Sequence, residues 1–178
     1  MRFGGGKNAL KQKNNLFNTS TPLSVQLLFE NSKLDLIKTL VLLYSFSLKG
    51  AKKYKKVQEV VFYYSLVNYN LVPIFNGDHV NNHLLSLNQY HRFQFNINQI
   101  LLHLWQLDFI EVKGDLTIKT LDIGVKLTEK GKEFVEELQL DYFQALINDY
   151  TSALDSVKCS RENLNKLKGG ISFDNKNE

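Results

Sequence analysis

The chain has 178 residues, a mass of 20.6 kDa and a net charge of +4, with 43% hydrophobic and 22% charged residues. These values are those of one folded domain with an appended helix or tail, and they exclude an intrinsically disordered chain. The single cysteine, Cys159, excludes an intramolecular disulfide and fits a reducing compartment. The longest strongly apolar stretch, Thr39–Leu48, has ten residues, whereas a membrane-spanning helix needs about 20. With no apolar signal segment near its start, we expect a soluble, cytoplasmic protein.

The first third of the chain predicts an arm followed by two helices. Residues 1–20 are mostly polar and contain three consecutive glycines, which is typical of a flexible N-terminal arm. Ser32 is a suitable cap for a helix that runs to about Leu48, with apolar residues at steps of three and four. A second helix, rich in aromatic residues, is expected over residues 52–71, and Pro73 should end it.

The middle of the chain predicts a third helix and a β-hairpin. Residues 79–87 favour a short helix, and Asn96 caps a clearer helix that runs to about Leu107. Leu104, Trp105 and Leu107 are expected on its packing side. Two strands follow, over residues 109–113 and 116–127, joined at Gly114 and Asp115. The alternation of the second strand breaks between residues 118 and 121, which indicates a bulge or bend.

The last part of the chain predicts two helices and a tail. Thr128 is a suitable cap for the first helix, and Gly131 would allow that helix to approach the sheet closely. A single long C-terminal helix is expected over residues 141–168, and residues 169–178 are expected to form a disordered tail.

The order helix, helix, helix, strand, turn, strand, helix is that of a winged helix. The stretch ILLHLWQLDFIEVKGDLTIKTLDIGVKLTEKGKEFVEEL, residues 100–138, resembles the corresponding part of many bacterial winged-helix families, including MarR-like and PadR-like regulators. We therefore expect a mainly α (α+β) protein. Residues 21–140 would form a winged-helix-like domain with a two-stranded wing, and residues 141–168 a long C-terminal helix.

The residues expected to contact DNA are poorly suited to reading a sequence. The third helix would offer Asn96, Asn98, Gln99, His103 and Gln106, but it has no lysine or arginine beyond Arg92 at its start. Phosphate contacts supply most of the affinity of DNA-binding proteins. A winged helix used for protein contacts is therefore favoured over one that reads bases.

Basic residues are concentrated in one short segment, residues 49–56, which carries five lysines and no acid, while the rest of the chain is nearly neutral. A solvated loop explains this cluster as well as a binding site does. As candidate contacts to DNA or to an acidic partner we take this segment together with two lysines of the hairpin: Lys49, Lys52, Lys53, Lys55, Lys56, Lys113 and Lys119.

Catalytic and cofactor motifs are missing from the sequence. His79 and His83 have the spacing of metal ligands but lack the glutamate of the HExxH motif, and nothing near Cys159 would activate its thiol. Phosphate-binding glycine loops and a G-x-S-x-G elbow are also absent from the sequence. We therefore expect no enzyme, no bound metal and no cofactor.

Aromatic residues are more numerous than a domain of this size needs. A tightly packed helical core would explain each of them singly, but as a set they favour an interface with a larger assembly. The candidates are Phe62, Tyr63, Tyr69 and Phe75 near the second helix, and Tyr142, Phe143 and Tyr150 on the last.

The chain also resembles the middle component of bacterial ABC-three-component systems, a group that includes the accessory subunit of Lamassu-type antiphage defence. The resemblance is carried by the chain's size, the helix SKLDLIKTLVLLYSFS, the helical middle and the late hairpin with KLTEKGKEFVEEL. It implies a noncatalytic adaptor that links an SMC-like or Rad50-like ATPase to an effector such as a nuclease. The alternative is a homodimeric winged-helix transcriptional regulator.

Overall fold

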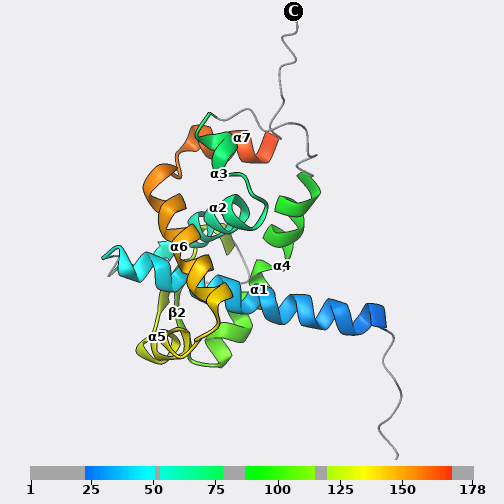
Figure 1. Cartoon of the computed structure of the whole chain (residues 1–178), viewed down its shortest axis with the longest axis vertical. Coiled ribbons are helices and arrows are strands. Elements are labelled where there is room, and N and C mark those ends of the chain that lie inside the picture. The colour runs from blue at the N-terminus through cyan, green and yellow to red at the C-terminus, as the bar shows by residue number, and fades with distance from the viewer. Residues whose placement is uncertain (1–22, 51–52, 78–86, 115–119, 170–178) are drawn as a thin grey trace, which may run out of the picture.

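The computed structural model describes residues 23–50, 53–77, 87–114 and 120–169. It is mainly helical, with a small antiparallel sheet (Figure 1). The predicted arm, most of the predicted tail and the predicted helix at residues 79–87 lie outside the described residues, apart from Leu87. The elements are α1 (Leu23–Leu48), β1 (Lys55–Lys56), α2 (Val57–Asn68), α3 (Val72–Phe75), α4 (Leu87–Gln106), β2 (Ile110–Lys113), the 3₁₀ helix η1 (Thr120–Asp122), β3 (Gly124–Leu127), α5 (Glu129–Glu136), α6 (Asp141–Ser156) and α7 (Arg161–Gly169).

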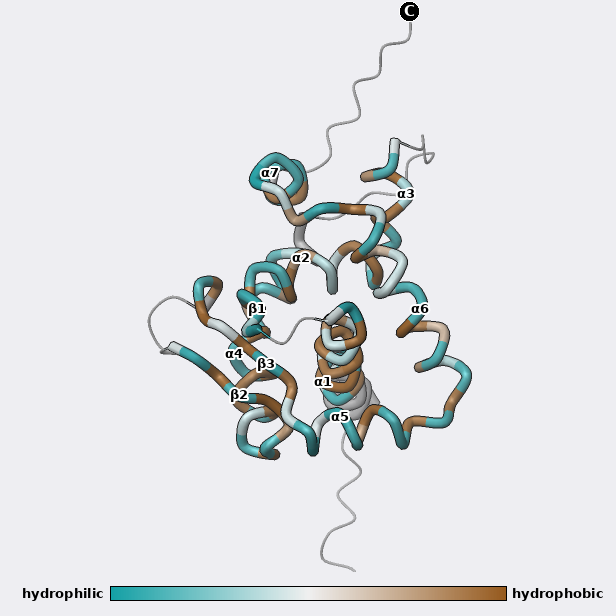
Figure 2. The backbone as a smooth tube through the Cα atoms, turned by 90° about the vertical axis from the view of Figure 1, so that its left-hand side faces the viewer, coloured by the Kyte–Doolittle hydropathy of each residue, from teal (hydrophilic) through white to brown (hydrophobic). Residues whose placement is uncertain are grey.

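Helix α1 is the centre of the molecule. Viewed along its axis, it has the sheet on one side, α6 on the other, α2 above and α5 below (Figure 2). Its residues Thr39–Leu43 are all buried, as expected for a helix that is packed on every side. The helix begins nine residues earlier than Ser32, the predicted cap.

The sheet has three strands in the order β1-β3-β2, all antiparallel, rather than the two strands expected. The additional strand comes from the lysine-rich segment, and α2 accordingly begins at Val57 instead of Lys52. The amide of Val57 donates a hydrogen bond to the carbonyl of Ile123, at 2.9 Å, which holds the start of α2 beside β3. A strand of two lysines has no apolar alternation, so the sequence offered no signal for it.

The hairpin is interrupted where predicted, but its second strand is shorter than the range 116–127 that was expected, because β3 covers only Gly124–Leu127. The 3₁₀ helix η1 falls where the alternation fails, and β3 begins only after it. The inner side of the hairpin carries Ile110 and Val125, both fully or almost fully buried.

Helix α4 is also longer than predicted, because it begins at Leu87 and Asn96 lies within it. Its C-terminus is set by Asp108, whose φ of 58° reverses the chain so that the Phe109 amide can donate to the Leu104 carbonyl, at 3.0 Å. Leu104 is buried as expected, but Trp105 and Leu107 are 51% and 46% exposed, so the prediction that they pack inward is wrong.

The start of α5 confirms two predictions made from the sequence. The Thr128 hydroxyl accepts a hydrogen bond from the Gly131 amide, at 3.0 Å, as an N-cap should. A Cβ at Gly131 would lie 2.3 Å from the carbonyl oxygen of Phe109. Only glycine therefore allows α5 to pack this closely against the chain entering β2.

The predicted long C-terminal helix is two helices, α6 and α7, because the chain becomes extended at Val157. The Tyr63 hydroxyl donates to the Val157 carbonyl, at 2.9 Å, and the Ser160 hydroxyl accepts from the Asn163 amide and so begins α7. The break between α6 and α7 is therefore held by a hydrogen bond from α2, and Ser160 caps the start of α7.

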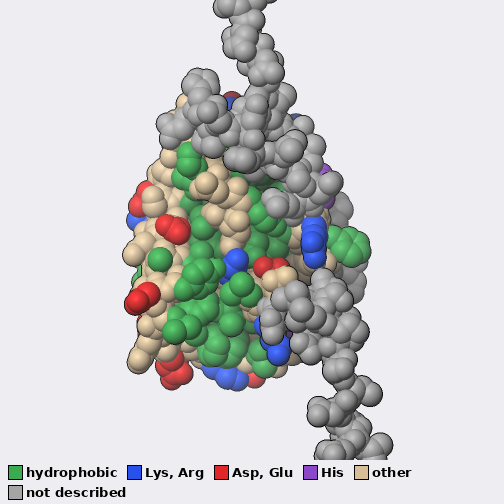
Figure 3. Space-filling view, turned by 45° about the vertical axis from the view of Figure 1, so that its right-hand side comes forward, with side chains coloured by type: hydrophobic (Ala, Val, Ile, Leu, Met, Phe, Trp, Pro, Cys, Tyr) green, Lys and Arg blue, Asp and Glu red, His purple; other side chains and the backbone are tan. Residues whose placement is uncertain are grey.

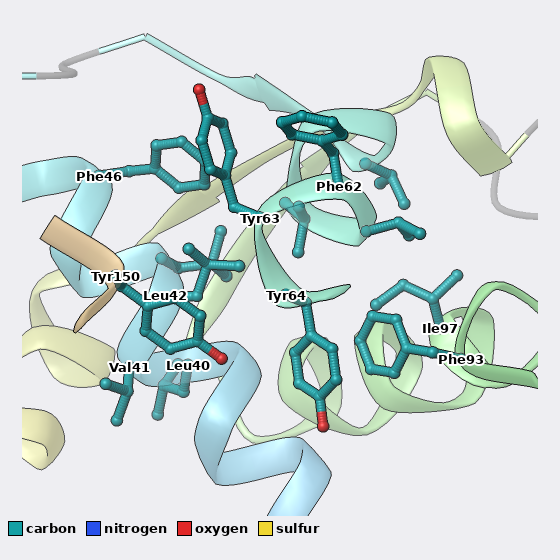
Figure 4. Close-up of a cluster of buried hydrophobic side chains, with 14 of the residues drawn as sticks. Leu40, Val41, Leu42, Phe46, Phe62, Tyr63, Tyr64, Phe93, Ile97 and Tyr150 are labelled. Atoms are coloured by element: carbon teal, nitrogen blue, oxygen red, sulfur yellow. The ribbon is translucent and has the colours of Figure 1, made fainter. Parts of the chain in front are cut away.

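The core lies between α1, α2, α4 and α6 and contains several aromatic rings (Figure 4). Tyr64 stacks on Phe93, with ring centroids 3.6 Å apart and planes 5° from parallel. Two buried tyrosine hydroxyls of this core are hydrogen-bonded: Tyr64 donates to Asp35, and Tyr150 accepts from Asn68, at 2.7 Å. Burial is thus compatible with these polar groups because each has a partner.

Candidate nucleic-acid interface

The sheet brings together lysines that are far apart in the sequence. Lys56 of β1 and Lys113 of β2 are both paired with Gly124 of β3, so the three residues form one row across the sheet. Both lysines are exposed, whereas the neighbouring Val125 is fully buried. Because side chains alternate between the two faces of a strand, this row belongs to the outer face of the sheet.

Tyr54 lies over the middle of that row. A Cβ at Gly124 would be 2.9 Å from the Tyr54 Cβ and 3.5 Å or less from the first two atoms of its ring. The Tyr54 hydroxyl donates to Oε2 of Glu111 on β2, at 2.7 Å, and this hydrogen bond raises the pKa of the phenol. Tyr54 therefore spans the outer face from the β1 side to β2, and its side chain stays 39% exposed.

Charges around Tyr54 are mostly positive. The Nζ of Lys113 lies 5.9 Å from the centroid of the Tyr54 ring. The one carboxylate of this group, Glu111, faces the Nζ of Lys126 at 4.0 Å. We call the set Tyr54, Lys56, Glu111, Lys113 and Lys126 the basic sheet face.

The remaining candidate lysines divide into three groups. Lys49 forms an ion pair with Asp155, and Lys55 forms one with Glu59 while its Nζ lies 5.1 Å from the centroid of Phe46. These two cations are therefore already partnered within the chain. Lys53 is exposed, and within the described residues it has no ion pair. Lys52 and Lys119 lie outside the described residues.

Helix α4 presents a different surface. Asn96, Gln99, His103 and Gln106 are exposed as predicted, and Asn98 is half-buried. A shallow hollow of about 630 Å³ lies between this helix and η1. It is lined by Gln94, Phe95, Asn96, Asn98, Gln99, Leu121 and Asp122. This surface combines amide and apolar side chains and carries few charges, in contrast with the basic sheet face.

The aromatic residues predicted as a protein interface are mostly core residues. Phe62, Tyr63, Phe143 and Tyr150 are between 0% and 7% exposed, which corrects the expectation that they form a surface for a partner. The physical reason is that α1 passes through the centre and packs against both α2 and α6. Tyr69 and Phe75 are half-buried against the core, and Tyr142 alone of the seven is largely exposed, at 49%.

Other apolar side chains are on the surface, and sequence reasoning missed them. Figure 3 shows hydrophobic side chains gathered on one face of the molecule. The large exposed hydrophobic residues of the described part of the chain include Phe95, Trp105, Leu107 and Leu140, with Phe95 at 85% and Leu140 at 66% exposure.

Residues considered for chemistry are not assembled into a site within the described part of the chain. Burial raises the pKa of the Cys159 thiol to about 11, which makes it a poor nucleophile. His79 and His83 lie outside the described residues. In the rest, no group of three or more His, Cys, Asp and Glu side chains is placed to hold a metal ion.

Comparison of the chain with protein-family models, with curated proteins and with solved structures finds no match. Among the described residues, none of the helices has the length and hydropathy needed to cross a membrane.

Proposed function

We propose that the chain is a noncatalytic accessory subunit that binds a nucleic-acid backbone on its basic sheet face. The single observation that carries this proposal is the row of Lys56, Gly124 and Lys113, with Tyr54 lying across it. Both lysines are exposed, and neither forms an ion pair within the described residues, so their charges are available to phosphate groups. Lys53, next to Tyr54 in the chain, adds a further exposed cation.

The arrangement of elements supports a winged-helix architecture for this subunit. Helix α1, strand β1, helices α2 and α4, and the hairpin β2-β3 follow one another in the order of a winged helix. The sheet order β1-β3-β2 agrees with it as well. In such a protein the hairpin is the wing, and the wing commonly lies against the phosphate backbone.

The resemblance to ABC-three-component systems supplies the proposed setting. In that setting the chain links an SMC-like or Rad50-like ATPase to an effector, and its sheet contacts DNA that the complex holds. A weak cationic surface is sufficient there, because DNA held at one site has a high effective concentration at the next. Purification of the tagged chain from its native operon after nuclease treatment should yield an ATPase in fixed ratio. Recovery of a homodimer alone would contradict this part of the proposal.

The backbone-binding proposal is tested by the salt dependence of DNA affinity. The triple variant Lys53→Glu, Lys56→Glu, Lys113→Glu should bind at least tenfold more weakly at low salt. Its slope of log affinity against log salt should be smaller by about 2 to 3, since each phosphate contact contributes about 0.9 to the slope. Fluorescence anisotropy of a labelled oligonucleotide measures both quantities.

The matched control is Lys33→Glu, Lys158→Glu, Lys168→Glu, which changes the net charge equally at three exposed lysines on α1, the α6–α7 turn and α7. It should reduce affinity much less than the sheet variant. Equal losses in both triple variants would show that only overall charge matters and would contradict a site on the sheet.

The second candidate function, a homodimeric regulator that reads DNA with α4, is favoured by the exposed amides Asn96 and Gln99 on that helix. It predicts a preference of at least about a thousandfold for one sequence over random DNA. The accessory-subunit proposal predicts nearly equal affinity for unrelated sequences.

A further inference from the structure

Tyr54 is fixed at both ends in a way that an ordinary surface tyrosine is not. At one end its Cβ occupies the space above Gly124, where any other residue would place its own Cβ only 2.9 Å away. At the other end its hydroxyl donates to Glu111 at 2.7 Å. The ring is therefore held along the sheet instead of projecting from it.

A ring held in this way offers an aromatic surface for stacking. Tyr54 is 39% exposed, and the sheet lies beneath it, so the open part of the side chain faces solvent. Proteins that bind single strands combine such aromatic surfaces with cations that follow the backbone. Because every base has a π-face, stacking of this kind requires no particular sequence.

The two cations of the row lie on different strands, and the Nζ of Lys113 is 5.9 Å from the centroid of the Tyr54 ring. Lys56 and Lys113 are on strands separated by β3, so their backbones are about 10 Å apart by the usual spacing of strands. Glu111 does not cancel them, since it accepts the Tyr54 hydroxyl and faces Lys126. A base on Tyr54 would thus have a lysine available for the phosphate on each side.

A duplex is a poor match for this surface. Its bases are already stacked inside the helix, and a side chain that inserts between them must project from the protein. Tyr54 is instead tied to Glu111 along the sheet. A duplex would therefore meet the lysines alone, whereas a single strand would meet both the lysines and the ring.

We infer that the basic sheet face binds single-stranded nucleic acid, with one base stacked on Tyr54 and the adjacent phosphates on Lys56 and Lys113. The inference rests on the proposed function, because it specifies which nucleic acid the same surface takes. It assigns Glu111 and Gly124 as positioning residues for the ring.

The test measures the affinity of the full chain for a thymidine oligonucleotide and for a duplex of the same length. Tyr54→Ala should weaken single-strand binding by about 5- to 150-fold, the value of one base–aromatic stack, and should leave duplex affinity unchanged. Tyr54→Phe keeps the ring but removes its hydrogen bond to Glu111, so it should lose part of the single-strand affinity, and less than Tyr54→Ala loses. Gly124→Ala, which displaces Tyr54 through its Cβ, should lose affinity selectively for the single strand.

The matched control is Tyr142→Ala, at a tyrosine on α6 with 49% exposure, which should change neither affinity. An oligonucleotide with abasic sites tests the same contact with the protein unchanged, and it should bind the unaltered chain more weakly than the intact strand. Equal losses for both ligands in Tyr54→Ala, or no loss with abasic strands, would overturn the inference while the backbone-binding proposal stands. Absence of salt-dependent binding to either ligand would overturn both.

Discussion

Two aromatic regions lie next to each other in the chain and have opposite environments. Tyr54 belongs to the basic sheet face, with its ring partly in solvent and its hydroxyl on Glu111. A few residues later, Phe62, Tyr63 and Tyr64 on α2 are buried in the core. The hydroxyls of the two tyrosines donate hydrogen bonds to the Val157 carbonyl and to Asp35. Residue type is thus the same in both regions, and the packing around the backbone decides the role.

The difference follows from what covers each element. Helix α2 is packed against α1, α4 and α6, and its residues Val60–Leu66 are all buried. The outer face of the sheet has no described element packed over it except Tyr54 itself. An aromatic residue in the first setting stabilises the fold, and one in the second is available to a ligand.

The largest expected difference between the two regions is the effect of alkaline pH on their tyrosines. Burial raises the pKa of Tyr63 and Tyr69 to about 12, and it raises the pKa of Tyr64 and Tyr150 further. In the unfolded chain all four tyrosines ionise near their usual pKa of about 10. The stability that they contribute is complete below about pH 10 and is lost as the pH rises toward 12, at about 1.4 kcal/mol per pH unit for each buried tyrosine.

We therefore expect cooperative unfolding between about pH 10 and 12, followed by circular dichroism together with tyrosinate absorbance. Replacement of Tyr63 by Phe should make stability less sensitive to pH in this range. Ionisation of most tyrosines while the fold remains intact would contradict the enclosed core. Tyr54 itself is on the surface and should ionise without unfolding the protein.

Truncation of the core should have the next largest effect. Phe62→Ala removes a fully buried ring that makes edge-to-face contacts with Tyr63 and Phe75. The expected loss is about 3–5 kcal/mol of unfolding free energy, measured by urea denaturation. Tyr54→Ala serves as the comparison, with an expected loss of less than about 1 kcal/mol because its side chain is partly exposed. Similar losses for the two variants would contradict the distinction between the regions.

The smallest expected effects are those of replacing two adjacent lysines, Lys55 and Lys56, with alanine. Lys55→Ala breaks a half-exposed ion pair with Glu59 and should cost at most about 1 kcal/mol of stability, with little change in nucleic-acid affinity. Lys56→Ala should leave stability unchanged and weaken binding several-fold, as measured by anisotropy at low salt. The reverse pattern would show that the lysine segment binds through the other face of β1.

Much of the fold could be predicted from local patterns in the sequence. The cap at Thr128, the close approach at Gly131 and the interruption before β3 were each visible in a few neighbouring residues, and each is confirmed. The predictions that were wrong concern features that depend on contacts between residues far apart in the sequence. Strand β1 exists because it pairs with β3, and α6 and α7 are separated where Tyr63 binds the Val157 carbonyl.

The candidate site was predictable only in part for the same reason. Lys53, Lys56 and Lys113 were named from charge alone, but nothing in the sequence indicated that Lys56 and Lys113 share one row. The position of Tyr54 over Gly124 likewise depends on a pairing between residues about seventy positions apart in the chain. Aromatic residues were misassigned because a run of them on a helix gives no indication of whether another helix covers it.

The most direct test of the binding surface is lysine acetylation mapped by mass spectrometry, with and without a saturating single-stranded oligonucleotide. Lys53, Lys56 and Lys113 should be protected when the oligonucleotide is bound, while the exposed Lys33, Lys158 and Lys168 react as before. Unchanged reactivity of Lys53, Lys56 and Lys113 under conditions where binding is complete would contradict the account.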